Sequence, residues 1–422
     1  MTVRLLGAVI VLLAVGAGGT ADLRLIHAVM GDGDQPGIVD SVEAIRGQAF
    51  DSVPVPVRAP ATLRDVLADV AVAEVIDDRT LAARGRAWRA IGLGDERTPQ
   101  RLWRLLARDV PRVAFDEESR QLYVDPSVLT PRDFAPNVDE EATTVLQMTG
   151  VRPDEPLIAH VLVHALQNQR GDTPRLARTT DELLSVAAMR EAEANLVAVY
   201  MRFRNLGIAG EMLKEGITPD VLRIADLLPP EIDDAPAIDR RLAEFVYLQG
   251  LTVATGQLQQ GGWGAVDVLR SRRSTLSWIT PESAEKEEPA PAIDIPPAPA
   301  APAEGFRPVD SDTLGPVAIG AVLAQGGMTE RSVERLIVYW RGDRLSRFVS
   351  ETGKGSHTHW ESRWADSASA EAFIAGLQET LDQRFSTGEG TAVDGVVQLT
   401  ADDASYRLRR VEGRVLVDVR TP

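Results

Sequence analysis

Residues 158–169 read IAHVLVHALQNQ, a mainly apolar run that carries two of the five histidines of this 422-residue chain. His160 and His164 are four residues apart, so a helix places both imidazoles on one face. Because their neighbours are apolar on nearly all sides, we expect this helix to be buried. Buried imidazoles need partners for their ring nitrogens, and a shared metal ion would supply one for both.

The same stretch has a second interpretation, in which the two histidines bond to backbone or side-chain groups of an ordinary core. A carboxylate on a second helix would favour the metal, because zinc sites of this type combine two histidines of one helix with an acidic residue of another. Residues 189–200 read MREAEANLVAVY, and at helical spacing Glu191 and Asn195 share a face whereas Glu193 points elsewhere. Glu191 is therefore the candidate third ligand, although a solvated helix surface would give the same pattern.

These segments resemble a family of exported bacterial proteins of the zincin (gluzincin) type, whose zinc helix reads like HELxHALQDQ. Here the stretch is HVLVHALQNQ, and EAEA at 191–194 is similar to the EGxA-like motif of the next helix in that family. The resemblance extends over most of the chain, through the segments 44–55, 113–124, 250–269, 272–283 and 339–349. It implies a zincin-like metallopeptidase-type domain with zinc bound by His160, His164 and Glu191.

The departures from the family pattern all remove ionisable groups. The glutamate after the first histidine would activate a zinc-bound water as general base, and here it is Val161, which cannot accept a proton. The aspartate of HALQDQ is Asn168, which we expect beside the ligands together with Asn195. A later stretch that reads like STEQxLHPE in the family has Leu276 for the glutamate and Thr280 for the histidine. The resemblance therefore implies a metal site that is kept and a peptidase reaction that is lost or impaired, with no confident catalytic residue.

Composition excludes some partners. The chain is 44% hydrophobic and 25% charged, which is typical of a globular protein, and its length predicts two or three domains. A net charge of −17 argues against nucleic acid or an anionic membrane as a partner. The chain has no cysteine, so it forms no disulfide.

The first 21 residues have the pattern of a signal peptide. Arg4 precedes an apolar stretch from Leu5 to Val15, and small residues follow before Asp22. The apolar stretch is short for a transmembrane helix, although an uncleaved membrane anchor is the alternative. We therefore expect an exported protein that is periplasmic, extracellular or anchored by this segment.

The rest of the chain predicts an α+β fold in three parts. Residues 22–282 are expected to form the zincin-like domain, largely helical around the site, with an N-terminal α/β subregion. A linker rich in proline and alanine follows at 283–310. Residues 311–422 are expected to form a small C-terminal α/β domain, in which 335–350 is a hairpin with its turn near Gly342-Asp343.

Shorter patterns predict individual elements. Apolar residues recur at helical or alternating spacing between turn-forming residues, and we assign helices and strands accordingly. The expected helices cover 63–75, 98–106, a segment from near Glu155, 180–205 and 368–385, and the expected strands lie in 52–60, 112–125, 357–364 and the final 27 residues.

Other candidate sites are weaker. His357 and His359 alternate on a predicted strand, so both face one side, either as metal ligands or as part of an exposed strand face. No G-x-S-x-G motif occurs, so a serine hydrolase is not supported. The stretch Gly261-Gly262-Trp263-Gly264 predicts a tight turn. It does not predict a phosphate-binding loop, because no P-loop spacing accompanies it.

Three functions stay open on sequence. The first is an exported zinc-binding protein, a catalytically inactive metallopeptidase homologue that acts by binding a peptide or an envelope protein. The second is an active zinc metallopeptidase in which another carboxylate replaces the missing base, although Glu155 and Glu193 are not on the ligand face. The third is a metal-free structural or adaptor protein of the cell envelope.

Overall fold

The computed structural model describes residues 23–31, 37–60, 62–107, 112–126, 128, 154–172, 177–204, 207, 221–222, 227–280, 305–387, 390–393, 395–401 and 403–422. These residues form a mixed structure of helices and strands, so the expected α+β class is confirmed. The expected signal segment, 1–21, and most of the expected linker lie outside the described residues. None of the helices in the described ranges is both long enough and apolar enough to cross a membrane.

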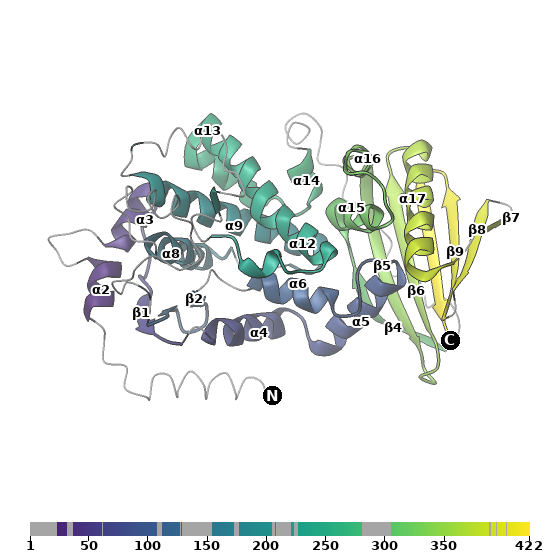
Figure 1. Ribbon diagram of the computed structural model, residues 1–422, viewed down its shortest axis with the longest axis horizontal. Coiled ribbons are helices and arrows are strands. Elements are labelled where there is room, and N and C mark those ends of the chain that lie inside the picture. Colours follow the sequence, from purple (N-terminus) through teal and green to yellow (C-terminus); the bar gives the residue numbers. More distant parts are fainter. Residues whose placement is uncertain are drawn as a thin grey trace.

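Two buried helices, α8 (Glu155–Gln169) and α9 (Thr180–Phe203), form the centre of the helical part, which is the purple-to-teal half of the molecule (Figure 1). Every side chain of α8 from Pro156 to Gln167 is buried, as its apolar sequence predicts. A capping box between Thr179 and Glu182 starts α9. The other helices of this part are α2 (Leu23–Met30), α3 (Ile38–Arg46), α4 (Leu63–Val75), α5 (Asp78–Ala90), α6 (Thr98–Ala107), α12 (Ala237–Glu244), α13 (Gly250–Val268) and α14 (Leu276–Ile279).

A three-stranded sheet lies beside α8. It consists of β1 (Val55–Arg58), β2 (Val113–Asp116) and β3 (Gln121–Val124), in the order β1-β3-β2. β3 pairs in parallel with β1 and antiparallel with β2, so the expected strand pair within 112–125 is confirmed. Among the described residues β2 is an edge strand of this sheet, and it packs against α8 and α4.

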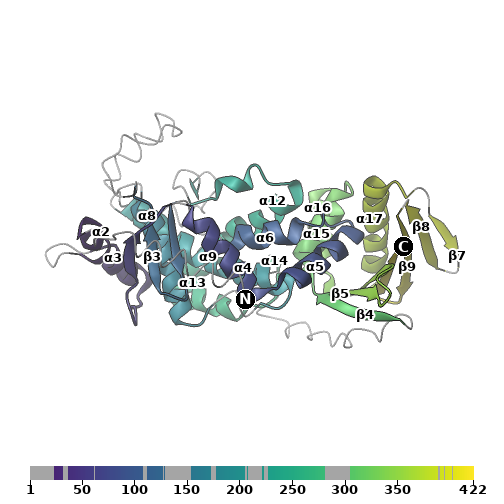
Figure 2. The ribbon, with the colours of Figure 1, turned by 90° about the horizontal axis from the view of Figure 1, so that it is seen from below.

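The C-terminal part is a seven-stranded antiparallel sheet with helices on it, drawn in green and yellow in Figures 1 and 2. α17 (Ser367–Phe385) packs against it through Phe373, whose ring lies 5.2 Å from that of Trp360 and 4.8 Å from that of Trp364. The strands, in spatial order, are β4 (Phe306–Asp312), β5 (Trp340–Ser350), β6 (Ser356–Trp364), β10 (Arg414–Thr421), β9 (Ala404–Val411), β8 (Val396–Ala401) and β7 (Thr391–Val393). The sheet begins at Phe306, earlier in the chain than the expected domain start at 311.

The expected hairpin over 335–350 is wrong. Residues Glu330–Ile337 form helix α16, and β5 runs without a turn from Trp340 to Ser350. Gly342-Asp343 lies at a bulge where the pairing of β5 with β6 shifts by a residue, and Gly342 has a φ of 138°. A bulge and a hairpin turn both favour glycine at positive φ, so the local sequence did not distinguish them.

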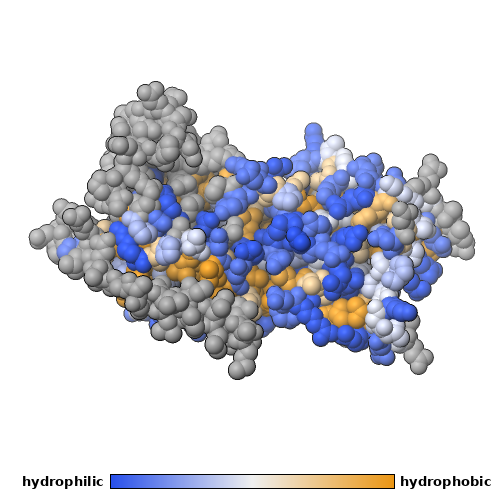
Figure 3. Space-filling view, turned by 60° about the horizontal axis from the view of Figure 1, so that its bottom comes forward, coloured by the Kyte–Doolittle hydropathy of each residue, from blue (hydrophilic) through white to orange (hydrophobic). Residues whose placement is uncertain are grey.

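The helical part and the sheet share one core. A single apolar cluster contains buried residues of α8 and α9 together with residues of the sheet. α15 (Gly315–Gln325) is buried from its first residue to Leu323 and contacts α9, α12, α17 and β5. Seen from the side of α4 and α6, much of the described surface is hydrophilic, with separate apolar patches (Figure 3).

Hydrogen bonds also connect the two parts at the first turn of α9. The carboxylate of Asp312, at the end of β4, accepts hydrogen bonds from the backbone N–H and the hydroxyl of Thr180, at 2.8 and 2.7 Å. It also accepts one from Trp88 Nε1 at 3.2 Å. The backbone N–H of Asp181 donates to the Thr313 carbonyl at 3.0 Å. The start of α9 is therefore fixed by the C-terminal part.

The side chain of Asp181 is buried in this junction. Its Oδ1 accepts hydrogen bonds from the backbone N–H and the hydroxyl of Thr275. Burial nevertheless outweighs these bonds and raises the pKa of Asp181 to about 6. The folded protein therefore retains a proton on Asp181 at pH values where the unfolded chain has lost it.

This proton predicts a pH dependence of stability. The contribution of neutral Asp181 is complete below a pH of about 4 and is lost as the pH rises through about 6, because the native state binds the extra proton. We expect a loss of up to roughly 3 kcal/mol in the free energy of unfolding from this group between pH 4 and pH 8. In Asp181→Asn, which is always neutral, urea unfolding at several pH values should show a flatter profile. Equal pH slopes in both proteins would contradict the assignment.

Candidate metal centre

Three potential ligand atoms converge between α8 and α9. His160 Nε2 lies 3.0 Å from His164 Nε2, Glu191 Oε2 lies 3.4 Å from His160 Nε2, and Glu191 Oε1 lies 3.5 Å from His164 Nε2. Tetrahedral zinc with bonds of about 2.0–2.1 Å holds its ligand atoms about 3.3 Å apart. All three residues are buried, and together they can hold a metal ion.

The hydrogen bonds around His164 leave its Nε2 lone pair directed at this point. Gln167 Nε2 donates to the Arg190 carbonyl and to Glu193 Oε2, at 3.0 and 2.9 Å, which fixes the orientation of the amide. Gln167 Oε1 is then an acceptor, so His164 Nδ1 donates to it at 2.8 Å. Burial lowers the pKa of His164 to about 3, so the ring is neutral and Nε2 has no proton. This lone pair faces His160 Nε2 at 3.0 Å and Glu191 Oε1 at 3.5 Å, so either a proton on His160 Nε2 or a cation between the three groups satisfies it.

Glu193 supports this arrangement from outside the ligand set. Its side chain is fully buried and accepts hydrogen bonds from Arg46 Nε at 2.5 Å and from Arg170 Nη2 at 2.6 Å. Burial opposes its ionisation, but these arginines outweigh burial and lower the pKa of Glu193 to about 2. The ionised Glu193 accepts a hydrogen bond from Gln167 Nε2, and Gln167 Oε1 accepts one from His164 Nδ1. Sequence reasoning missed this role, because neither arginine is near Glu193 in the chain.

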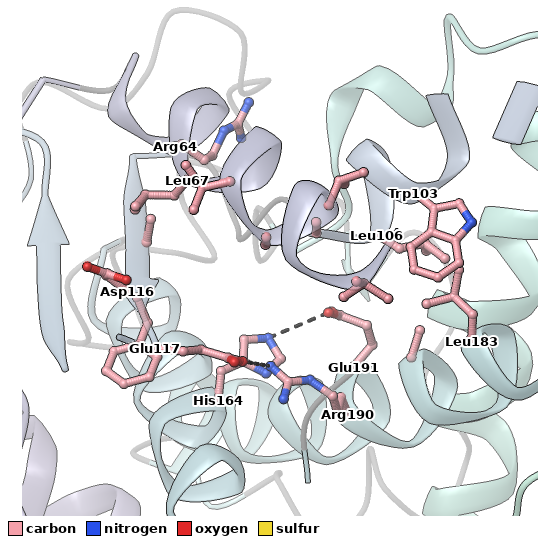
Figure 4. A pocket seen from close by; sticks show the side chains of 18 residues that line it. Arg64, Leu67, Trp103, Leu106, Asp116, Glu117, His164, Leu183, Arg190 and Glu191 are labelled. Atoms are coloured by element: carbon pink, nitrogen blue, oxygen red, sulfur yellow. Dashed lines mark hydrogen bonds and ion pairs between the residues drawn. The ribbon is translucent and has the colours of Figure 1, made fainter. Parts of the chain in front are cut away.

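A cavity of about 100 Å³ opens onto the ligands (Figure 4). His164 and Glu191 line its floor, and apolar side chains of α4 and α6 line the opposite wall. Ala114 and Phe115 of the edge strand β2 also line it. The volume is enough for several water molecules or a small side chain, so a metal ion held by these residues would be reachable from the cavity.

The cavity also contains charged side chains that the sequence did not single out. Asp116 at the end of β2, Glu117 in the turn after it and Arg190 of α9 line it with the two ligands. Glu117 Oε1 lies 3.4 Å from Arg190 Nη2. Figure 4 shows Glu117 and Arg190 beside His164. Glu117 precedes α9 by a long stretch of sequence, so no local pattern connects it with the ligands.

The remaining candidate residues lie around the centre. Val161 is fully buried in the apolar core and does not line the cavity. Asn195 is fully buried one helical turn after Glu191, and within the described residues its side-chain atoms have no hydrogen-bond partner. Asn168 is half-buried near the end of α8, and its side chain forms no hydrogen bond in the described part of the chain. Leu276 is the first residue of the short helix α14, and Thr280 directly follows this helix. Neither residue lines the cavity.

The second histidine pair lies in the C-terminal sheet. His357 Nε2 and His359 Nδ1 bond to the same oxygen, Asp418 Oδ1, at 2.9 and 2.8 Å. The expectation that both histidines face one side of the strand is therefore confirmed. The two imidazoles lower the pKa of Asp418 well below its usual range although its partial burial opposes this. In the described residues, the metal-ligand geometry is met at His160, His164 and Glu191 and not at this pair.

Comparison with known proteins characterises the C-terminal part alone. A family model described as a domain of unknown function (DUF8575) matches residues 304–422, which contain β4 to β10 and none of the three ligands. No curated protein and no solved structure matches the chain. The resemblance to zincin-type proteins therefore stays a prediction.

The hydrogen bonds to His164 predict the effect of one substitution. In Gln167→Leu the His164 ring loses the acceptor that fixes its proton on Nδ1, and we expect zinc affinity to fall by roughly 10–100-fold. Competition with a chromogenic chelator measures the affinity. Asn168→Ala, next to it on α8, is the matched control and should bind zinc as the unchanged protein does. Equal affinity in Gln167→Leu would exclude a role for this hydrogen bond in metal binding.

Proposed function

We propose that this protein is an exported, zincin-like zinc-binding protein, a metallopeptidase homologue with little or no catalytic activity that acts by binding. The main support for the proposal is that two imidazole nitrogens and one carboxylate converge, with the spacing between their atoms that a tetrahedrally coordinated ion requires. The hydrogen bonds of Gln167, which place the His164 proton on Nδ1 and leave Nε2 free to bind a metal, are consistent with it.

The donor set favours zinc. Imidazole nitrogens suit zinc, copper, iron and nickel, and a set of two histidines and a glutamate with one open position is that of catalytic zinc sites. When bound, a zinc ion polarises a carbonyl group or a water molecule placed beside it. Glu193 and Gln167 would keep His164 in the tautomer that the metal needs.

The absence of a base at position 161 supports weak or absent catalysis. A general base contributes about 10²–10⁴-fold to such a reaction. Val161 has no proton acceptor, and its buried side chain does not reach the cavity. The protein would therefore retain the metal and a binding cavity while hydrolysing its ligand slowly or not at all.

The cavity walls favour a peptide as the ligand. The wall of α4 and α6 is apolar, and β2 is an edge strand, the kind of element to which an extended peptide can add as a further strand. Export, inferred from the first 21 residues, would make a peptide or protein of the cell envelope the partner. Zinc would bind the ligand through a carbonyl or carboxylate oxygen.

An active metallopeptidase is the second candidate, and Glu117 is the observation that favours it. Glu117 lines the same cavity as His164 and Glu191, whereas Glu193 is held by arginines behind the ligands. A carboxylate in this cavity can take a proton from a water molecule. The ion pair of Glu117 with Arg190 disfavours this role, since Arg190 lies 3.4 Å from the carboxylate oxygen that would have to face the water molecule.

Elemental analysis of the purified full-length protein tests the metal. We expect about one zinc ion per chain, and a content near zero in His160→Ala and in Glu191→Ala, because each removes a ligand. Asn168→Ala should keep its zinc. A native protein that neither contains zinc nor binds added zinc would remove both metal-dependent functions and leave the structural or adaptor protein.

A peptidase assay with a mixed peptide library tests catalysis. We expect the native protein to show no cleavage above that of His160→Ala, while zinc-dependent retention of library peptides is detected by mass spectrometry. Cleavage by the native protein that Glu117→Gln abolishes, with zinc content unchanged, would establish the second candidate function instead.

A further inference from the structure

A second cavity, of about 320 Å³, lies where the two parts of the molecule meet. The residues that line it are distant in sequence from the metal ligands. Helix α5 forms one side of it, and strands β5, β9 and β10 and the end of α17 form the other. Figure 1 shows α5 beside the sheet at this position. The lining contains Arg86, Arg89, Arg347 and Tyr406, so it is rich in hydrogen-bond donors.

Arg347 is the unusual member of this lining. Its side chain is only 6% exposed, and its hydrogen bonds go to two neutral hydroxyls, Thr358 Oγ1 at 3.1 Å and Ser356 Oγ at 2.9 Å. Within the described residues its Nε is buried without a partner, and no carboxylate lies within ion-pair distance. A buried cation without a counter-ion is costly, and the usual remedy is an anion.

The acidic side chains of the cavity form their ion pairs with an arginine other than Arg347. Glu96 and Asp403 both line the cavity, but both pair with Arg89, at 3.1 and 3.3 Å. Arg86 is exposed and has no ion pair in the described part of the chain. Burial and then repulsion from Arg86 lower the pKa of Arg347 to about 10, against the attraction of Glu96. The side chains that line the cavity therefore carry three positive and two negative charges, and Arg347 and Arg86 are the arginines among them that have no ion pair of their own in the described residues.

We infer that this cavity is an anion-binding site for a phosphate group, held between Arg347 and Arg86 at the junction of α5 with the C-terminal sheet. The side chains of the lining have a net positive charge, and the oxygens of a phosphate group accept from guanidinium donors in the geometry that arginine favours. Tyr406 and Thr421 line the same cavity, and each carries a hydroxyl group.

The volume indicates the size of the ligand. A cavity of about 320 Å³ is near the lower end of the range for small-molecule sites, larger than inorganic phosphate requires and sufficient for a small phosphomonoester. Phe385 adds an apolar surface on which the carbon part of such a molecule can pack. The site is independent of the metal centre, since none of the three metal ligands lines it.

Isothermal titration calorimetry on the full-length protein tests the proposal, with inorganic phosphate and glycerol 3-phosphate as probes and sodium chloride at matched ionic strength as the blank. We expect one phosphate group bound per chain. Arg347→Met, which keeps the length of the side chain without its charge, should weaken binding by about tenfold or more. Arg86→Ala should also weaken it, and Arg79→Ala, an exposed arginine on the same helix outside the cavity, should not.

Thermal unfolding distinguishes loss of binding from loss of fold. Without phosphate, Arg347→Met should melt no lower than the native protein, because it removes an unpaired buried charge, and phosphate should stabilise the native protein alone. Binding of inorganic phosphate but not of the ester would identify the free ion as the ligand and still support the site. Equal phosphate binding by the native protein, Arg347→Met and Arg86→Ala, no binding at all, or binding of malonate in place of phosphate would overturn the proposal.

Discussion

The carboxylate of Glu193 lies in the middle of the helical part, out of contact with solvent, and its charge must be balanced there. Arg46 reaches it from α3 and Arg170 from the end of α8, while Glu193 itself belongs to α9. The carboxylate of Glu193 thus connects three helices through ion pairs. Gln167 uses the same carboxylate to orient its amide, so the direction of the His164 ring depends on a charge that is not itself a ligand. Losing either arginine would leave a buried anion without sufficient compensation.

Much of the helical part follows from sequence because its pattern is local. The apolar run of α8 predicts a buried helix, the four-residue spacing of His160 and His164 predicts a shared face, and both are observed. Glu191 could be chosen over Glu193 by helical spacing alone. The supporting contacts could not be found in this way, because Arg46 and Glu117 come from segments distant in the chain, and nothing in their own neighbourhood indicates where they meet α9.

The error at Gly342-Asp343 has a related physical cause. Glycine followed by aspartate satisfies a two-residue turn, and the choice between a turn and a bulge depends on strands that pair elsewhere in the sequence. Here β6 pairs along the whole of β5, and Asp343 is drawn inward, where it accepts hydrogen bonds from the backbone of Leu314 and Gly315 at the start of α15. The aspartate whose sequence context predicts a turn is instead a buried carboxylate that caps the N-terminus of α15.

α15 has a consequence for how such a chain can be assembled from smaller units. The segment matched by the family model, 304–422, contains α15, whose faces are covered in part by α9 and α12 of the helical part. Cut at its sequence boundary, this segment would expose an apolar helix and the aspartate that holds Thr180. It is therefore not an interchangeable module. In this chain α9 and α12 are therefore part of the structure of the segment, because they cover its apolar helix.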